Sequence, residues 1–167
     1  DAVDNILTTP NHNMLKITDS TGWYDVGRLC EPRVMHRGFP HWLRNETELT
    51  TSMGTPRQER VGVFASLWLG DPDIDATERI IVDPQVKRVK MPYVLDIDTW
   101  SPFNSQSTAF HAELAPLLLM WPGVGRFDDI FASYVARAYM DANDWYHAAG
   151  SPPVRQDRNP HDLVKDL

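Results

Sequence analysis

The stretch from residue 127 to residue 142 constrains the fold more than any other part of the chain. Apolar side chains recur there at i, i+3, i+4 and i+7, the spacing that gathers them on one face of an α-helix. These residues are Phe127, Ile130, Phe131, Tyr134, Val135, Ala138 and Tyr139. The stretch therefore predicts an amphipathic helix over residues 127–142.

Other segments predict strands and shorter helices that alternate along the chain. Residues 60–69 and 88–97 are rich in β-branched and aromatic residues, which is typical of strands. Residues 74–81 predict a short helix, and so does a stretch from about Ala112 that is interrupted near Pro116. This alternation favours the α/β class, and a chain of 167 residues suits one domain.

Composition disfavours several kinds of function. The formal charge of −7 argues against nonspecific binding to nucleic acid, and no apolar run reaches the length of a membrane span. Because Cys30 is the single cysteine, an intrachain disulfide and a cysteine-based zinc site are excluded. The chain has no P-loop and no GxGxxG motif, and the lack of a GxSxG motif disfavours a serine hydrolase.

Asp128 and Asp129 stand at the start of the predicted helix, one residue after the glycine-bearing stretch WPGVGR. Acids in a first helical turn gain roughly 0.3–1 kcal/mol each from the helix dipole, so a structural role is a real alternative to a catalytic one. A carboxylate carried by a loop to the edge of a sheet is also well placed as a general base. Successive helical side chains project about 100° apart, so we expect one acid to face a site and the other to cap the helix. We favour Asp129 as the base.

Three alternating acids, Asp71, Asp73 and Asp75, follow the first predicted strand. Such a pattern suggests divalent-cation binding. The simpler reading is a strand-to-helix turn in which the aspartates cap and turn the chain. Both readings stay open, although the carboxyl end of a strand is where ligands gather in open α/β sheets.

Arg37 and Arg44 lie in the stretch HRGFPHWLR, within a region of residues 19–60 that predicts mostly loop. Two arginines beside aromatic residues in a loop suit a diphosphate and a ring, and an ordinary surface position is the alternative. No two histidines have the HExxH spacing, and His161 taken alone is expected at the surface.

Five motifs in order resemble two related groups of enzymes. The motifs are RGFPHWLR, SLWLGDPDIDA, NSQSTAFHAEL, GVGRFDDIFASY and RNPHDLVKDL, and the resemblance covers roughly residues 30–167. In this order the chain resembles the reversibly glycosylated polypeptides, which are UDP-arabinopyranose mutases, and the related STELLO-like glycosyltransferases. The resemblance implies the glycosyltransferase-A fold, an α/β architecture with a mixed sheet flanked by helices that binds nucleotide sugars.

The resemblance also implies roles for individual residues. Arg37 matches the arginine that becomes glycosylated in the mutases, and Arg44 matches a second arginine that is required there. Asp128 and Asp129 match an acidic pair at the start of the catalytic helix. The expected substrate-binding residues are Arg37, Arg44, Trp68, Asp73, Asp75, Asn104 and Arg126. His161 lies where enzymes of this fold often supply a metal ligand, so Mn²⁺ or Mg²⁺ is the expected cofactor.

The fold's metal-binding DxD motif is expected in a nucleotide-binding half that would come before residue 1. The letters DPD at 71–73 and DID at 96–98 fall too late in the fold for it. We therefore expect residues 1–167 to form a single domain, the C-terminal and acceptor-side portion of a longer enzyme.

The resulting hypothesis is a metal-dependent glycosyltransferase that moves a sugar from a nucleotide-diphosphate sugar to a hydroxyl acceptor, with a carboxylate as general base. The alternative is a UDP-sugar mutase that is transiently glycosylated on Arg37, and a third possibility is a non-catalytic binding module. The expected partners are the nucleotide sugar and the acceptor, with no nucleic acid and no membrane span. The expected location is the cytoplasm, with Golgi association in a eukaryote.

Overall fold

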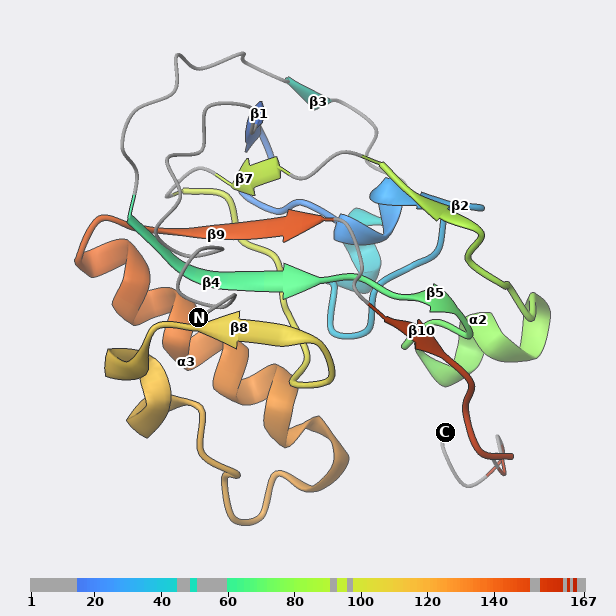
Figure 1. Cartoon of the computed structure of the whole chain (residues 1–167). Helices are drawn as coiled ribbons and strands as arrows, with labels where there is room; N and C mark the ends of the chain where they lie inside the picture. The colour runs from blue at the N-terminus through green and yellow to red at the C-terminus, as the bar shows by residue number, and fades with distance from the viewer. Residues whose placement is uncertain are drawn as a thin grey trace.

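The computed structural model describes residues 15–44, 49–50, 60–90, 93–95, 98–150 and 154–160, together with residues 162 and 164. Its largest element is a six-stranded sheet in the order β3-β1-β7-β9-β4-β8 (Figure 1). Its strands, in chain order, are β1 (Leu15–Asp19), β3 (Leu49–Thr50), β4 (Arg60–Ser66), β7 (Tyr93–Leu95), β8 (Thr108–Phe110) and β9 (Trp145–Gly150). Strands β1 and β7 run parallel, as do β4 and β9, and the other neighbours are antiparallel. The molecule is therefore a mixed α/β structure, as predicted.

Smaller elements surround this sheet. Two-stranded sheets join β5 (Leu69–Gly70) to β10 (Arg155–Gln156) and β2 (Cys30–Glu31) to β6 (Arg88–Val89). The helices are α2 (Ala76–Ile81) and α3 (Asp128–Ala142), and the 3-10 helices are η1 (Val26–Leu29), η2 (His41–Leu43), η3 (Ala112–Leu117) and η4 (Gly125–Phe127). Because β10 pairs in parallel with β5, the C-terminal segment lies against the middle of the chain.

Most predicted elements are confirmed with altered bounds. The predicted strand at 60–69 is β4 followed by β5, and the predicted helix at 74–81 is α2. The predicted strand at 88–97 contains β6 and β7, which belong to different sheets, and its residues 91–92 and 96–97 lie outside the described residues. The predicted helix from Ala112 is the 3-10 helix η3, which contains Pro116.

Strand β4 lies inside the sheet and is buried along most of its length. Its register with β9 shifts between Val61 and Val63, a β-bulge that changes which side chains share a face. Val63 packs in the apolar cluster beneath α3, whereas Val61 and Phe64 pack in a separate cluster with Ala148. Without the bulge, Val61 and Val63 would point to the same face, because side chains alternate along a strand.

Helix α3 lies along one face of the sheet, beside β4, β8 and β9 (Figure 1). The prediction of this helix is confirmed, but of the seven residues on its predicted apolar face only Ile130 is among the buried ones. Its buried residues are Ile130, Ala132, Ser133, Ala136, Arg137 and Met140. Phe127, Phe131 and Tyr139 are instead 54%, 42% and 38% exposed. The buried face thus combines the small side chains of Ala132, Ser133 and Ala136 with the larger ones of Ile130, Arg137 and Met140.

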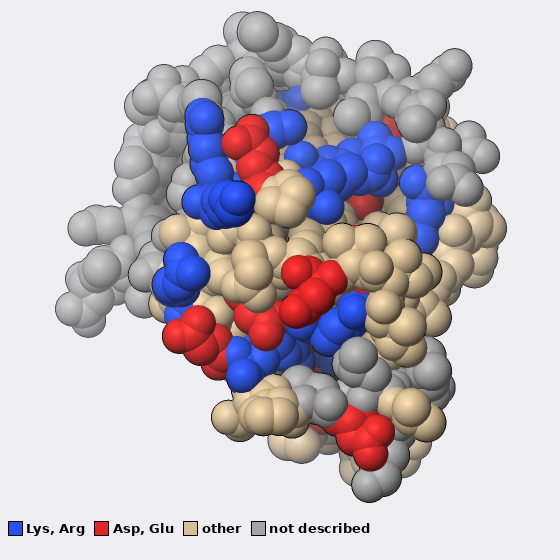
Figure 2. Space-filling view, turned by 90° about the vertical axis from the view of Figure 1, so that its right-hand side faces the viewer, with Lys and Arg blue, Asp and Glu red and all other residues tan. Residues whose placement is uncertain are grey.

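Acidic and basic side chains are interspersed on the face of the molecule that carries α2 and β10 (Figure 2). Several of them form arginine–carboxylate pairs, and pairs of this kind also occur in the candidate functional site. Within the described part of the chain, no helix has both the length and the apolar character needed to cross a membrane.

Candidate functional site

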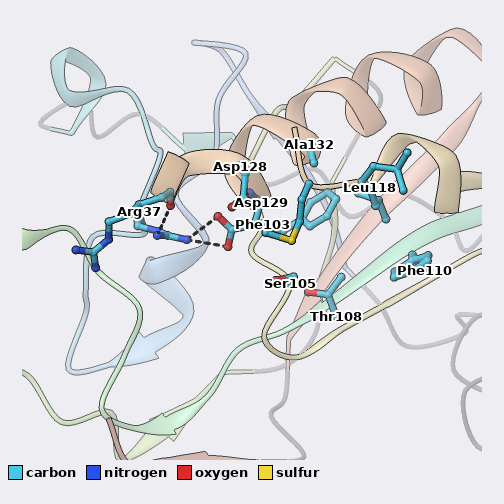
Figure 3. A pocket seen from close by; sticks show the side chains of 12 residues that line it. Arg37, Phe103, Ser105, Thr108, Phe110, Leu118, Asp128, Asp129 and Ala132 are labelled. Atoms are coloured by element: carbon cyan, nitrogen blue, oxygen red, sulfur yellow. Dashed lines mark hydrogen bonds and ion pairs between the residues drawn. The ribbon is translucent and has the colours of Figure 1, made fainter. Parts of the chain in front are cut away.

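A cavity of about 430 Å³ opens beside the first turn of α3, between that helix, β8 and the segment that connects η3 to α3 (Figure 3). This volume falls within the range of about 300–1,000 Å³ that small-molecule sites occupy. The polar residues that line it are Arg37, Ser105, Thr108, Arg126, Asp128 and Asp129. Four of these six were predicted site residues, so the cavity is the candidate functional site.

Arg37 is held in one position by four neighbours. Its Nη2 atom donates to both carboxylate oxygens of Asp129 at 2.7 Å, and its Nη1 atom donates to the backbone oxygen of Arg126 at 3.1 Å. Its Nε atom lies 3.3 Å from Oδ2 of Asp73, and its guanidinium lies 5.8 Å from the ring centre of Phe127. A guanidinium fixed in this way is preorganised, because little side-chain freedom remains to be lost when a ligand binds.

Asp73 is a buried carboxylate that joins three parts of the chain. It is 2% exposed, and its Oδ2 atom accepts from Nδ2 of Asn104 at 3.0 Å in addition to its ion pair with Arg37. Its Oδ1 atom accepts from Nη1 of Arg158 at 2.8 Å. Asp73 does not line the cavity, so it acts as the anchor behind Arg37.

Trp68 supports this anchor from the core. Its indole N–H donates to Oε1 of Gln106 at 2.8 Å, and the backbone N–H of Gln106 donates to Oδ1 of Asn104 at 3.1 Å. Trp68 is only 2% exposed and belongs to an apolar cluster. The prediction of Trp68 as a substrate contact therefore does not match its position, because a fully buried ring cannot touch a ligand in the cavity.

Asp128 and Asp129 both line the cavity, whereas the helical spacing predicted that only one would. The 3-10 helix η4 leads directly into α3, so both acids fall in the first turn and neither is the N-cap residue. Their hydrogen bonds differ. Asp129 receives both bonds from Arg37 and a third from the Ile130 amide at 2.9 Å, whereas Asp128 accepts from the Asp129 amide at 2.8 Å through Oδ1. The hydrogen bond that Asp128 accepts involves Oδ1 and not Oδ2.

Arg44 and Asp75 form a separate pair that does not line this cavity. Asp75 is the N-cap of α2, as predicted, and accepts from the Glu78 amide at 3.1 Å. Burial alone would raise the pKa of the Asp75 carboxyl, but hydrogen bonds from Arg44, Thr77 and the Glu78 amide outweigh burial and hold the pKa below its ordinary value. The pair therefore fixes the start of α2 and the end of the loop that carries Arg37.

Two buried histidines lie close to this region without lining the cavity. His36 precedes Arg37, and its Nδ1 atom lies 2.9 Å from the Arg37 backbone oxygen. Burial lowers the pKa of His36, and burial together with the nearby Arg137 lowers the pKa of His147 to about 3. Both rings are thus neutral at pH 7, and neither is in a position to exchange protons with a ligand in the cavity.

The described residues do not assemble a metal site. Among them, no group of three or more histidine, cysteine, aspartate or glutamate side chains lies close enough to hold an ion. The alternating acids each pair with an arginine instead: Asp71 with Arg79, Asp73 with Arg37 and Arg158, and Asp75 with Arg44. This pairing supports the simpler reading of the three acids, as turn and cap residues. The predicted metal ligand His161 lies outside the described residues.

Arg158 is the main site residue that the sequence did not predict. The parallel pairing of β5 and β10 sets Gln156 opposite Gly70, so the residues that follow each strand leave the sheet at the same end. This register carries Arg158 to Asp73, which lies 85 residues earlier. In the sequence, Arg158 stands out only as the first residue of the RNPHDLVKDL motif, because nothing in the spacing of the chain reveals a pairing of two such short strands.

Comparison with models of known protein families gives no match to this chain, and a search of curated proteins finds no relative. The expected functions therefore rest on the five motifs and on the geometry of the site.

Gly38 is required for Arg37 to meet α3. It has a φ of +86°, and a Cβ atom there would lie 2.5 Å from Cγ2 of Ile130. Its backbone oxygen also accepts a hydrogen bond from the Tyr134 hydroxyl on the same helix. We expect Gly38→Ala to lower the free energy of unfolding by about 2–4 kcal/mol, from a left-handed backbone and overpacking combined.

Gly123→Ala is the matched control for this prediction, with urea unfolding as the measurement. Gly123 has a φ of +85°, but a Cβ atom there would meet nothing within 4 Å. Its alanine variant carries only the backbone strain, about 1–2 kcal/mol. Equal losses for the two variants would show that the contact between Gly38 and Ile130 is not tight.

Proposed function

We propose that this chain is the acceptor-side part of a glycosyltransferase that uses a nucleotide-diphosphate sugar. The observation that carries the proposal is the meeting of Arg37, Asp73, Asn104 and Asp129 from four separate segments. Arg37 and Asp129 line one end of a ligand-sized cavity, and Asp73 and Asn104 lie behind them. Each of these residues belongs to one of the motifs by which the chain resembles the reversibly glycosylated polypeptides and the STELLO-like glycosyltransferases. A glycosyltransferase-A fold is part of the proposal, and the mixed α/β architecture is compatible with it.

In the proposed reaction, a hydroxyl group of the acceptor lies in the cavity beside Asp128. The Asp128 carboxylate takes the hydroxyl proton while the hydroxyl oxygen forms a bond to the anomeric carbon of the donor sugar. The bond between that carbon and the diphosphate oxygen breaks, and the nucleoside diphosphate leaves with the bonding electrons. General base catalysis of this kind contributes typically about 10²–10⁴-fold to a rate.

The hydrogen bonds favour Asp128 over Asp129 as the base. Both oxygens of Asp129 accept from Arg37, so protonation of Asp129 would break an ion pair that fixes the arginine. Asp128 has a carboxylate oxygen without such a partner, and it faces the same cavity. We therefore assign Asp129 to the positioning of Arg37 and the proton transfer to Asp128.

A divalent cation stays a prediction that the resemblance alone supports. If Mn²⁺ or Mg²⁺ is bound, it would offset charge that develops on the leaving diphosphate. The described residues assemble no group of three or more metal-ligating side chains, and the proton transfer to Asp128 requires no cation.

The proposal is tested by incubating the intact protein with UDP-sugars labelled in the sugar, with and without hydroxyl-bearing acceptors. We expect label to move to the acceptor and one nucleoside diphosphate to be released for each sugar transferred. Ring-size isomerisation without an added acceptor, with label retained on Arg37, would favour the mutase instead. Neither transfer nor isomerisation with any UDP-sugar would leave the non-catalytic binding module as the better description.

A further inference from the structure

The cavity has a wall that the proposed chemistry does not use. Six apolar residues line it: Phe103, Phe110, Leu118, Leu119, Met120 and Ala132. Figure 3 shows Arg37 and Asp129 at one side of the cavity, and Phe110 and Leu118 at the opposite side. Three wall residues are well exposed, with Phe110 at 40%, Leu119 at 61% and Met120 at 83%. The cavity is thus polar at one end and apolar along the rest, with side chains that a ligand could still cover.

The charges at the polar end favour a neutral ligand. Among the described lining residues, the charged ones are two arginines, Arg37 and Arg126, and two aspartates, Asp128 and Asp129, so their formal charges cancel. The Arg37 guanidinium is already bound by Asp129 through both carboxylate oxygens. A diphosphate would meet two carboxylates here, which is the wrong electrostatic match for it. Ser105 and Thr108 add neutral hydroxyl groups to the lining.

We propose that the acceptor is a neutral hydroxyl compound with an apolar chain or ring, and not an unmodified sugar. Its hydroxyl group lies beside Asp128, and its apolar part covers Phe110, Leu118 and Met120. This inference rests on the proposed function, because it names the acceptor class of that same site. An unmodified sugar would leave the apolar wall in water, whereas an apolar chain gains the free energy of removing both surfaces from water.

The test is a calorimetric titration of the intact protein with methyl, butyl and hexyl β-D-glucoside, below the concentrations at which they form micelles. All three share one neutral headgroup, so a difference in affinity reports the apolar part alone. Burying one methylene contributes about 0.8 kcal/mol, so the affinity should rise roughly fourfold for each methylene. The hexyl glucoside should then bind about 15-fold more tightly than the butyl glucoside. Equal affinities for the three, or no binding by any of them, would overturn the proposal.

Variants locate the binding to this wall. Phe110→Ser and Met120→Ser should each weaken hexyl glucoside binding by at least about fivefold and leave methyl glucoside binding unchanged. Both side chains are partly or largely exposed, so the variants should fold, which circular dichroism checks. Ile81→Ser is the matched control, because Ile81 is 80% exposed on α2 and does not line the cavity. Hexyl glucoside binding that the two wall variants leave unchanged would overturn the assignment.

The outcome is separable from that of the proposed function, because the titration contains no nucleotide sugar. If the protein transfers sugar to acceptors without any dependence on their apolar part, the glycosyltransferase proposal stands and the acceptor class is wrong. If chain-length dependence appears without transfer of any sugar, the ligand class stands and the glycosyltransferase proposal fails.

Discussion

Replacing Asp128 with asparagine is expected to lower turnover of the intact protein by about 10²–10⁴-fold, with little change in stability. Asparagine keeps the oxygen that accepts the Asp129 amide, so the first turn of α3 should stay as it is. It cannot take up a proton at neutral pH, so only the proposed general base is lost. The measurement is the rate of sugar transfer at saturating donor and acceptor, with urea unfolding to follow stability.

The variant Asp129→Asn distinguishes the proposed general base, Asp128, from Asp129, which we propose positions Arg37. The change removes the charge that Arg37 binds through two hydrogen bonds at 2.7 Å in a mostly buried position. We therefore expect Asp129→Asn to reduce stability as well as turnover, because Arg37 loses one of its two ion pairs. Normal turnover in Asp128→Asn, combined with lost turnover and unchanged stability in Asp129→Asn, would reverse the assignment of the base.

The sequence predicted the members of the site better than it predicted their contacts. Arg37, Asp73 and Asp129 were each singled out by residue type and motif. Their meeting depends on where a loop, a strand end and a helix start come together, and local spacing carries no such information. Parallel strands of two residues, such as β5 and β10, leave almost no periodic signal, yet their register is what brings Arg158 to Asp73.

Most of the predicted apolar face of α3 is not buried, and the cause differs from the one that hid the contacts of Arg158. Two stripes of the helix follow a helical period: the bulky one through Phe127, Phe131 and Tyr134, and the small one through Ala132 and Ala136. The small stripe is buried together with Ile130 and Met140. The bulky stripe contributes instead to an open aromatic groove of about 520 Å³. The helical period identifies the helix, but several faces of this helix carry apolar residues, so the period alone does not determine which face packs against the sheet.

The position of Trp68 also could not be predicted from the local sequence. It lies in SLWLGDPDIDA, one of the five motifs on which the expected resemblance rests, and next to the predicted acids, so a ligand contact was the expectation. Burial is a property of the assembled fold, and here it assigns the ring to the core and the indole N–H to Gln106.

Replacing Asp73 with alanine should lower the free energy of unfolding by about 3–5 kcal/mol, a large part of the about 5–15 kcal/mol that stabilises a typical domain. Asp73 is 2% exposed and binds three side chains: Arg37 at 3.3 Å, Arg158 at 2.8 Å and Asn104 at 3.0 Å. Its removal leaves two mostly buried guanidinium groups with less negative charge beside them. Removing one partner of a buried ion pair is strongly destabilising, because the remaining charge is no longer compensated. Arg37 also loses its anchor, so turnover should fall together with stability.

Asp83→Ala supplies the matched comparison for Asp73→Ala in urea unfolding at neutral pH. Asp83 also pairs with an arginine, Arg79 at 3.4 Å, but its side chain is 77% exposed. Water screens such a pair, so its removal should change the free energy of unfolding by no more than about 0.5 kcal/mol. The difference between the two variants measures what burial adds to an arginine–aspartate pair in this chain. A loss below about 1 kcal/mol for Asp73→Ala would mean that Arg37 and Arg158 find other partners, and that Asp73 does not anchor the site.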